Sequence, residues 1–204
     1  MTQTNLPILY LRDVVLLPFN DIRLEFSNDI DKKILNIAES NYDGYVLLIN
    51  LNDPLEEEPD YNTLPDIGIL GKIKSKIDLP NGITRVVMTG IDRVEIVSIN
   101  NNNNNDFLSA FVISTKEYDY NEVEASALRR VLYRKLDEYI DISPYMSNTV
   151  IGRITEVKNI SKLSDIIVSE LPLEYNEVLK YVSITNPMNR IREITLDLSK
   201  EIET

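Results

Sequence analysis

Apolar and polar residues alternate most regularly between Asp66 and Ile99, in two runs separated by a short break. Alternation with a period of two predicts strands with one buried and one solvated face. The buried parity of the first run holds Ile69, Ile73, Ile77 and Leu79, and the other parity holds Leu70, Lys72, Lys74, Lys76 and Asp78. The break, Pro80-Asn81-Gly82, predicts a hairpin turn because glycine accepts the positive φ of tight turns. The stretch therefore predicts a long β-ribbon.

Shorter patterns surround this ribbon in the first half of the chain. A helix is predicted from about 30 to 41, capped by Ser27, Asn28 or Asp29 and ended by Gly44. Strands are predicted over residues 6–10, 22–26, 45–51 and 107–115, of which 45–51 is apolar enough for a central strand.

Strand patterns stop near residue 118, and helical spacing continues to the end of the sequence. The predicted helices are a stripe from Val123 to Ile140, a segment near 147–157, a short helix opened by Ser161 or Ser164, one near 173–182, and one capped by Asn186. Met188, Ile191, Thr195, Leu198 and Ile202 of the last helix follow heptad spacing. The heptad is still running at Thr204, so we expect the sequence to be a fragment of a longer chain, with a frayed natural terminus as the alternative. We predict a β-rich region over 1–118 and a helical region over 119–204.

Composition excludes several classes of chemistry. The 204 residues contain neither histidine nor cysteine, which excludes Ser-His-Asp and Cys-His catalysis, disulfides and His-containing zinc sites. A net charge of −12 disfavours nucleic-acid binding through phosphate neutralisation. The first residues lack a signal-peptide pattern, and no apolar run is long enough to span a membrane.

Motifs for catalysis or cofactor binding are also missing from the sequence. It has neither a G-x-x-x-x-G-K-[ST] nor a G-x-G-x-x-G pattern, so no nucleotide site is expected. Three serines have a lysine next to them in the sequence, and adjacent side chains point apart on a strand or helix. They are Ser75 with Lys74 or Lys76, Ser161 with Lys162, and Ser199 with Lys200. We therefore expect a binding or assembly module with no catalytic, cofactor-binding or metal-ligating residue in this chain.

Lys72, Lys74 and Lys76 are the one basic cluster with a defined geometry. The period of two places all three on one face of the predicted ribbon, where they are candidates for gripping an acidic polypeptide or a phosphate. The alternative is that they keep an exposed strand soluble and prevent edge-to-edge pairing. Two polar segments have similar alternatives: the acidic stretch 52–63 is a solvated loop or a cation site, and the Asn100–Asn105 run is a loop tip or a binding segment.

Three blocks of the sequence resemble the N-terminal domain of bacterial Lon, the ATP-dependent protease family. Residues 6–26 resemble its opening LP-x-L-P-L-R-D-x-V-x-x-P pattern, with Tyr10 in place of the usual proline. Residues 67–97 resemble its second block through Gly68, Ile73, Leu79, Pro80, Gly82, Val87, Gly90, Arg93 and Ile96. Residues 163–203 are similar to its helical block. Together the blocks cover most of the chain.

The resemblance implies an α+β fold, with a PUA-like β subdomain followed by a helical bundle whose last helix continues toward a coiled coil. It implies a non-catalytic region that recognises unfolded or tagged proteins and supports a cytoplasmic homohexamer, which degrades misfolded and regulatory proteins. The implied full-length enzyme carries an ATPase module using ATP and Mg²⁺ and a Ser–Lys protease domain, neither of which maps to this sequence. The alternatives are a stand-alone PUA-like module that binds RNA or a small ligand, and a small Ser–Lys hydrolase.

Overall fold

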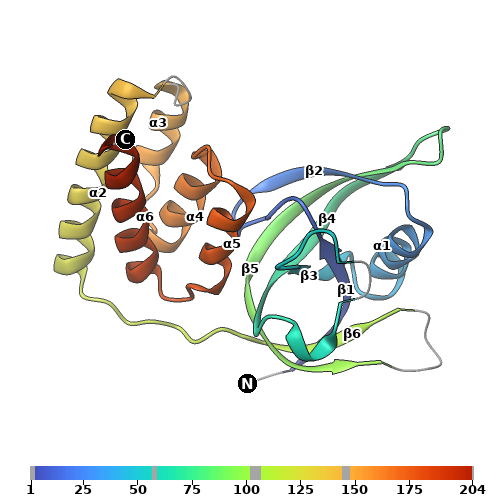
Figure 1. Ribbon diagram of the computed structural model, residues 1–204. Coiled ribbons are helices and arrows are strands. Elements are labelled where there is room, and N and C mark those ends of the chain that lie inside the picture. The colour runs from blue at the N-terminus through green and yellow to red at the C-terminus, as the bar shows by residue number, and fades with distance from the viewer. Residues whose placement is uncertain (1–2, 57–58, 102–106, 144–147, 204) are drawn as a thin grey trace. The chain divides into compact units, whose positions relative to one another are not determined.

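The structure, a computed structural model, describes residues 3–56, 59–101, 107–143 and 148–203 (Figure 1). The chain separates into two compact units, Met1–Thr115 and Lys116–Thr204. In the described ranges the first unit contains the sheet and one α-helix, and the second contains helices, so the α+β class is confirmed. Each unit is described by itself. No helix in the described ranges is long and apolar enough to cross a membrane.

The sheet of the first unit is largely closed on itself. Its strands are β1 (Thr4–Leu11), β2 (Asp21–Phe26), β3 (Tyr45–Asn50), β4 (Ile67–Asp78), β5 (Thr84–Asn100) and β6 (Ser109–Ser114). The strand order is β2-β5-β4-β3-β1-β6, and β6 pairs with β5 as well as with β1. Five strands thus form a closed ring, which removes their free edges. Among the described strands, only β1 and β3 pair in parallel.

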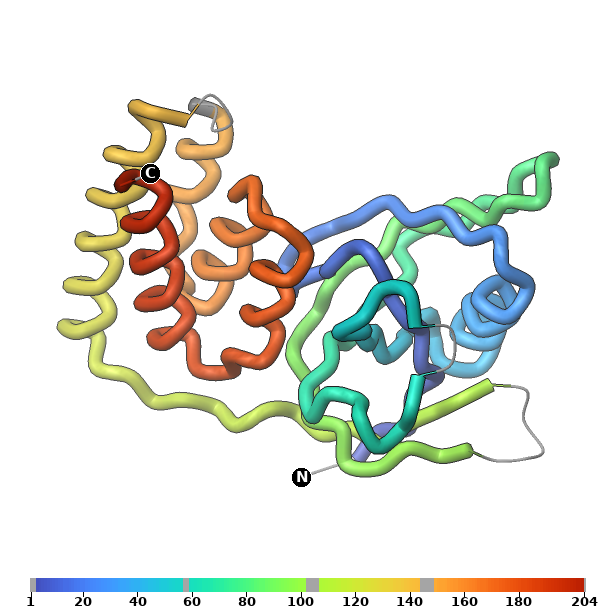
Figure 2. Tube along the Cα trace, in the orientation of Figure 1, coloured from blue at the N-terminus to red at the C-terminus, as the bar shows by residue number. Residues whose placement is uncertain are grey.

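The 17-residue β5 makes this closure feasible because its two halves have different partners. Its first half pairs with β2 and β4, whereas its second half pairs with β4 and β6 (Figure 2). The predicted turn joins β4 to β5, with Gly82 at φ +80°. A core cluster inside the ring is formed by Leu6, Ile8, Leu47, Ile49, Val94, Ala110 and Val112. Strand β2 pairs with β5 from outside the ring and is not part of it.

Helix α1 (Asp29–Asn41) packs against β1 and β3. Of the three predicted caps, Asn28 is the one used: its Oδ1 accepts from the backbone N–H of Ile30 at 2.7 Å. Gly44 ends the helix as predicted, at φ +75°, with its N–H donating to the carbonyl of Ala38 at 2.8 Å. A short 3-10 helix, η1 (Tyr61–Thr63), precedes β4.

The second unit holds five described α-helices. They are α2 (Glu122–Ile142), α3 (Asn148–Glu156), α4 (Ile160–Glu170), α5 (Tyr175–Ser183) and α6 (Pro187–Glu203). Helix α6 packs against α2 and α4. Asn186 caps α6 as predicted, since its Oδ1 accepts from the Met188 N–H at 2.9 Å. The cap of α4 was predicted wrongly: Asn159, not Ser161 or Ser164, accepts from the Lys162 N–H at 2.8 Å.

The buried faces of two helices also differ from prediction. On α2 the buried residues include Leu132, Leu136 and Tyr139, but Val123 is 77% exposed and Val131 is 44% exposed. On α6 Ile194 is buried instead of Thr195, which is half-buried and bonds the Ile191 carbonyl. Apolarity alone does not orient a helix when apolar residues cover more than one face. Packing against neighbouring helices selects the buried stripe.

Candidate functional site

The three predicted contact lysines lie on β4, but the alternation that placed them on one face is interrupted. The pairing of β4 with β5 shifts register between Ile73 and Ser75, so Lys74 lies in a β-bulge. Ile73 before the bulge is 9% exposed, whereas Ile77 after it is 58% exposed. This inversion is expected when a strand gains one residue. The prediction of one shared lysine face is therefore wrong.

Lys72 and Lys74 each reach a separate carboxylate. Lys72 Nζ lies 2.9 Å from Asp43 Oδ2 and 4.0 Å from the centroid of the Tyr45 ring, and its hydrogen bond to Asp43 raises the lysine pKa. Lys74 Nζ lies 2.6 Å from Asp21 Oδ2, and this hydrogen bond lowers the pKa of Asp21. Both ammonium groups are thus engaged within the first unit.

Lys76 points to α1 instead. Its Nζ donates to Asn36 Oδ1 at 2.8 Å and lies 3.2 Å from Glu39 Oε2, and only 12% of its side chain is exposed. Lys76 therefore connects the ribbon to the helix. The role of the three lysines as substrate or partner contacts stays a prediction, and the structure does not bring them together at one site.

An exposed aromatic side chain is held on the first unit by a close backbone contact. Gly90 on β5 accepts from the Phe19 N–H at 2.8 Å and donates to the Asn20 carbonyl at 2.9 Å. A Cβ at Gly90 would lie 2.3 Å from the carbonyl oxygen of Leu17, so only glycine allows this approach. Phe19 has φ +66°, which is uncommon for a bulky residue, and is 44% exposed. The loop therefore presents an aromatic ring from a well-defined backbone.

A cavity of about 350 Å³ lies beside the start of α1. Its lining is Ile8, Tyr10, Arg12, Asn28, Ile30, Asp31, Ile34, Pro59, Asn101, Phe107 and Leu108. The volume falls at the small end of the usual range for ligand sites. Apolar walls with a few polar groups suit an apolar side chain or small molecule that carries a hydrogen-bonding group.

The polar groups of this cavity are perturbed by burial. Tyr10 Oη is buried without a hydrogen-bond partner among the described residues. Burial, together with the neighbouring Tyr61, raises the pKa of Tyr10 to about 12, so the phenol stays protonated at neutral pH. Burial also raises the pKa of Asp31, against the opposing effect of Arg12. The cavity thus offers a neutral donor beside a cation and a carboxylate.

The polar loops show no ligand site within the described ranges. Asp60 Oδ1 accepts from the Asn62 N–H at 2.9 Å and caps η1, a structural role. The described residues contain no group of three or more carboxylates positioned for a metal ion. Residues 57–58 of the acidic stretch and 102–105 of the asparagine run lie outside the described residues.

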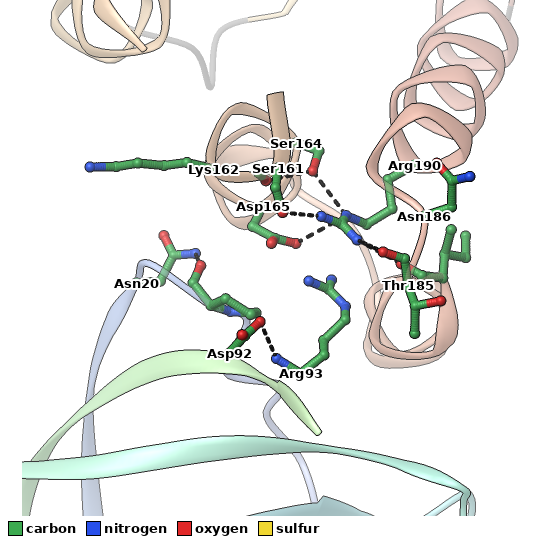
Figure 3. Close-up of polar contacts among 12 residues, drawn as sticks. Asn20, Asp92, Arg93, Ser161, Lys162, Ser164, Asp165, Thr185, Asn186 and Arg190 are labelled. Carbon is green, nitrogen blue, oxygen red and sulfur yellow. Dashed lines mark hydrogen bonds and ion pairs between the residues drawn. The ribbon is translucent and has the colours of Figure 1, made fainter. Parts of the chain in front are cut away.

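The second unit buries a charged network whose groups bond one another (Figure 3). Arg190 on α6 is 1% exposed, and its Nε lies 3.6 Å from Oδ1 of Asp165, which is fully buried on α4. The guanidinium donates to Ser164 Oγ at 2.9 Å, Ser161 Oγ at 2.5 Å, Ile184 O at 2.8 Å and Thr185 O at 3.0 Å. Lys162 points away from Ser161 (Figure 3). The network joins α4 to the start of α6 and is structural.

The second unit also has a shallow apolar hollow of about 190 Å³ between α2 and α3. Its lining is Tyr133, Leu136, Asp137, Ile140, Ile151, Ile154 and Thr155.

Sequence patterns did not indicate the structural roles of Phe19, Tyr10 and Arg190. Phe19 had a local signal, an aromatic residue between Pro18 and Asn20 in a predicted break, but the environments of the other two depend on distant segments.

Comparison with known proteins gives one consistent result. The family described as the ATP-dependent protease La (LON) substrate-binding domain matches residues 5–200. Lon protease of Buchnera aphidicola subsp. Baizongia pistaciae is 28% identical over 97% of this chain and 25% of its own length. Lon protease 1 of Bacillus subtilis is 28% identical over 92% of this chain and 24% of its own length. The chain thus spans about a quarter of these relatives.

Two solved structures share the fold. The N-terminal domain of the Mycobacterium avium complex Lon protease has a TM-score of 0.73 at 17% identity, covering 97% of this chain and 99% of that one. The Lon N-terminal domain protein from Xanthomonas campestris has a TM-score of 0.64 at 15% identity, covering 94% of this chain and 96% of that one. Both units of the chain are included in these matches.

Proposed function

The chain belongs to the family of Lon substrate-binding domains, and on this premise we propose that it captures unfolded or tagged proteins for a longer ATP-dependent protease. The observation that carries the proposal is the family match over residues 5–200. The chain is non-catalytic in this role.

We assign substrate capture to the first unit. Its exposed apolar side chains include Phe19 at 44%, Ile30 at 61% and Ile77 at 58%. Ile30 also lines the 350 Å³ cavity, so one apolar wall continues from the cavity to the surface. Unfolded chains differ from folded ones because they expose apolar side chains. Exposed apolar groups on a rigid backbone can bind these side chains with little loss of conformational entropy in the binding unit.

The remaining roles follow from the family resemblance. The second unit supports homohexamer assembly, with α6 leading toward a coiled coil in the full-length protein. The full-length enzyme uses ATP and Mg²⁺ in a separate module, cleaves substrates with a Ser–Lys dyad and works in the cytoplasm. Since this chain spans about a quarter of its relatives, these activities reside outside the 204 residues.

Binding of a fluorescein-labelled, reduced and carboxymethylated model protein tests substrate capture. We expect the 204-residue chain to bind this unfolded probe and not its native form, and Phe19→Ser to weaken binding about tenfold, as burial of one aromatic ring contributes about 1.5–3 kcal/mol. Leu196→Ser is the matched control, because Leu196 is 56% exposed but lies on α6. Equal affinity for native and unfolded probes, or none for either, would overturn the proposal.

A small-ligand or RNA-binding module is the second candidate, favoured by the cavity beside Tyr10. The carboxylate partners of Lys72, Lys74 and Lys76 disfavour RNA, because phosphate would have to displace them. We expect replacement of all three lysines by glutamine to leave RNA binding undetectable, as in the wild type. Salt-sensitive RNA binding by the wild type that the triple variant loses would support the alternative instead.

A further inference from the structure

Strand β2 is the edge strand of the sheet. It pairs with β5 along Asp21–Phe26, and among the described residues no strand pairs with its opposite edge. In Figure 1 it follows β5 along the outside of the ring. An unpaired edge presents alternating N–H and C=O groups that match another extended backbone.

The hydrogen-bond pattern identifies which groups face outward. Gly90 N–H donates to the Asn20 carbonyl at 2.9 Å, so the next pair, Asp21 with Thr89, is not mutually hydrogen-bonded. Bonded and non-bonded pairs alternate in an antiparallel ladder. The N–H and C=O groups of Asp21, Arg23 and Glu25 therefore point away from β5.

The other side of β5 confirms this parity independently. Leu79 N–H donates to the Ile83 carbonyl at 2.8 Å at the hairpin end of the ladder. Alternation from there bonds Arg85 and Val87 to β4. These two residues are opposite Glu25 and Arg23, and so they cannot also bond β2.

The side chains leave this edge accessible. Asp21, Arg23 and Glu25 are exposed, whereas Ile22, Leu24 and Phe26 are half-buried on the other face. Two of the three charged groups are held on the ribbon: Asp21 by Lys74 at 2.6 Å, and Glu25 by Arg85 at 2.7 Å. The exposed Phe19 lies two residues before the strand. The edge thus continues directly from the apolar surface assigned to substrate capture.

From these observations we infer that the outer edge of β2 binds an extended segment of the substrate polypeptide by strand addition. The inference rests on the proposed function and names how the substrate backbone is held. Main-chain bonding recognises extended chains of any sequence, which suits capture of unfolded proteins. Apolar residues at alternate positions of the bound segment would extend the surface formed by Ile22, Leu24 and Phe26.

A second copy of the chain is the other candidate occupant of this edge. Because outward-facing residues must lie opposite one another, antiparallel self-pairing of β2 has two five-residue registers. The register over Asp21–Glu25 places Arg23 opposite Arg23 and is destabilised by like charges, whereas the register over Ile22–Phe26 places Arg23 opposite Glu25. We assign the edge to the substrate because Phe19, two residues before the strand, belongs to the apolar surface assigned to substrate capture, and dimer formation is an outcome that the test distinguishes.

The test removes one outward donor without touching the ladder. Arg23→Pro deletes the outward N–H, and proline is tolerated where that N–H faces solvent. Arg23→Ala is the matched control because it removes the same side chain and keeps the donor. With the unfolded fluorescent probe, we expect Arg23→Pro to bind about tenfold more weakly than Arg23→Ala, the effect of one main-chain hydrogen bond.

Hydrogen exchange on the wild-type chain gives a second readout that does not depend on the variant folding. We expect the probe to slow exchange of the Asp21, Arg23 and Glu25 amides, with little change at Ile22 and Leu24, which the ladder already protects. Equal affinities of the two variants with unchanged exchange would overturn strand addition, whereas substrate capture would stand if the wild type still binds. A dimer lost only in Arg23→Pro would assign the edge to a second copy and also overturn it.

Discussion

The β unit and the helical unit differ in the polar groups that they leave open. Each buries one polar atom without a hydrogen-bond partner among the described residues, Tyr10 Oη in the β unit and Arg129 Nε in the helical unit. In the β unit, however, β2 also has an edge that no described strand pairs with, and Tyr10 lines a cavity. The helical unit surrounds its buried Arg190 with four oxygen acceptors and the Asp165 carboxylate. Unsatisfied groups suit binding, whereas satisfied buried networks suit a unique and rigid packing.

Rigidity within each unit comes from contacts inside that unit. In the β unit the exposed surface is positioned by contacts such as the approach of Leu17 to Gly90. In the helical unit ion pairs join Lys180 on α5 to Asp197 on α6 at 2.5 Å, and Glu124 on α2 to Arg192 on α6. Loss of a single contact should therefore affect one unit and spare the other.

The largest expected effect is on the helical unit. Arg190→Leu leaves the buried Asp165 carboxylate without its Arg190 partner and should cost about 3–5 kcal/mol of unfolding free energy. Urea denaturation followed by far-UV circular dichroism measures it. Arg192→Leu is the control, since Arg192 pairs with Glu124 but is 45% exposed, and should cost less than about 1 kcal/mol. Equal stability of the two variants would show that the buried Arg190 network contributes no more unfolding free energy than the exposed Arg192–Glu124 pair.

A pair of glycine substitutions should affect the two units in opposite directions. Gly90→Ala places a Cβ against the Leu17 carbonyl and should destabilise the β unit by about 1–3 kcal/mol, while weakening capture through Phe19. Gly152→Ala on α3 meets nothing within 4 Å and should stabilise the helical unit by about 0.5–1 kcal/mol. Thermal unfolding of both variants tests the contrast. An unfolding temperature of Gly90→Ala equal to that of the wild type would contradict it.

The smallest effect is a pH dependence in the helical unit. Burial raises the pKa of Asp197, but hydrogen bonds from Lys180, Tyr181 and Lys200 outweigh burial and lower this pKa below 3.8. A lowered folded-state pKa stabilises the fold above the unfolded value, and this contribution is lost as pH falls through the folded value. Denaturation midpoints of wild type and Asp197→Asn should therefore converge below about pH 4. Midpoints that stay equally far apart at every pH would contradict this.

Local sequence signals predicted much of the fold. Asn28 and Asn186 cap the helices predicted for them, Gly44 ends α1, and the turn at Pro80–Gly82 joins two long strands. These features depend on residues within a few positions of each other, so the sequence contains the required information. The lysine cluster was the one candidate site, and its shared face required an alternation that the bulge at Lys74 breaks.

The sequence by itself determined the type of each element, the change from strands to helices near residue 118, and the three blocks that identify the Lon family. Tertiary structure alone decided the closure of the sheet through β5 and β6, the approach of Leu17 to Gly90, the open edge of β2 and the network around Arg190. Helix caps and turns are satisfied locally. Strand partners, cavities and buried charges are satisfied by segments that are distant in the sequence, and only the folded chain brings those segments together.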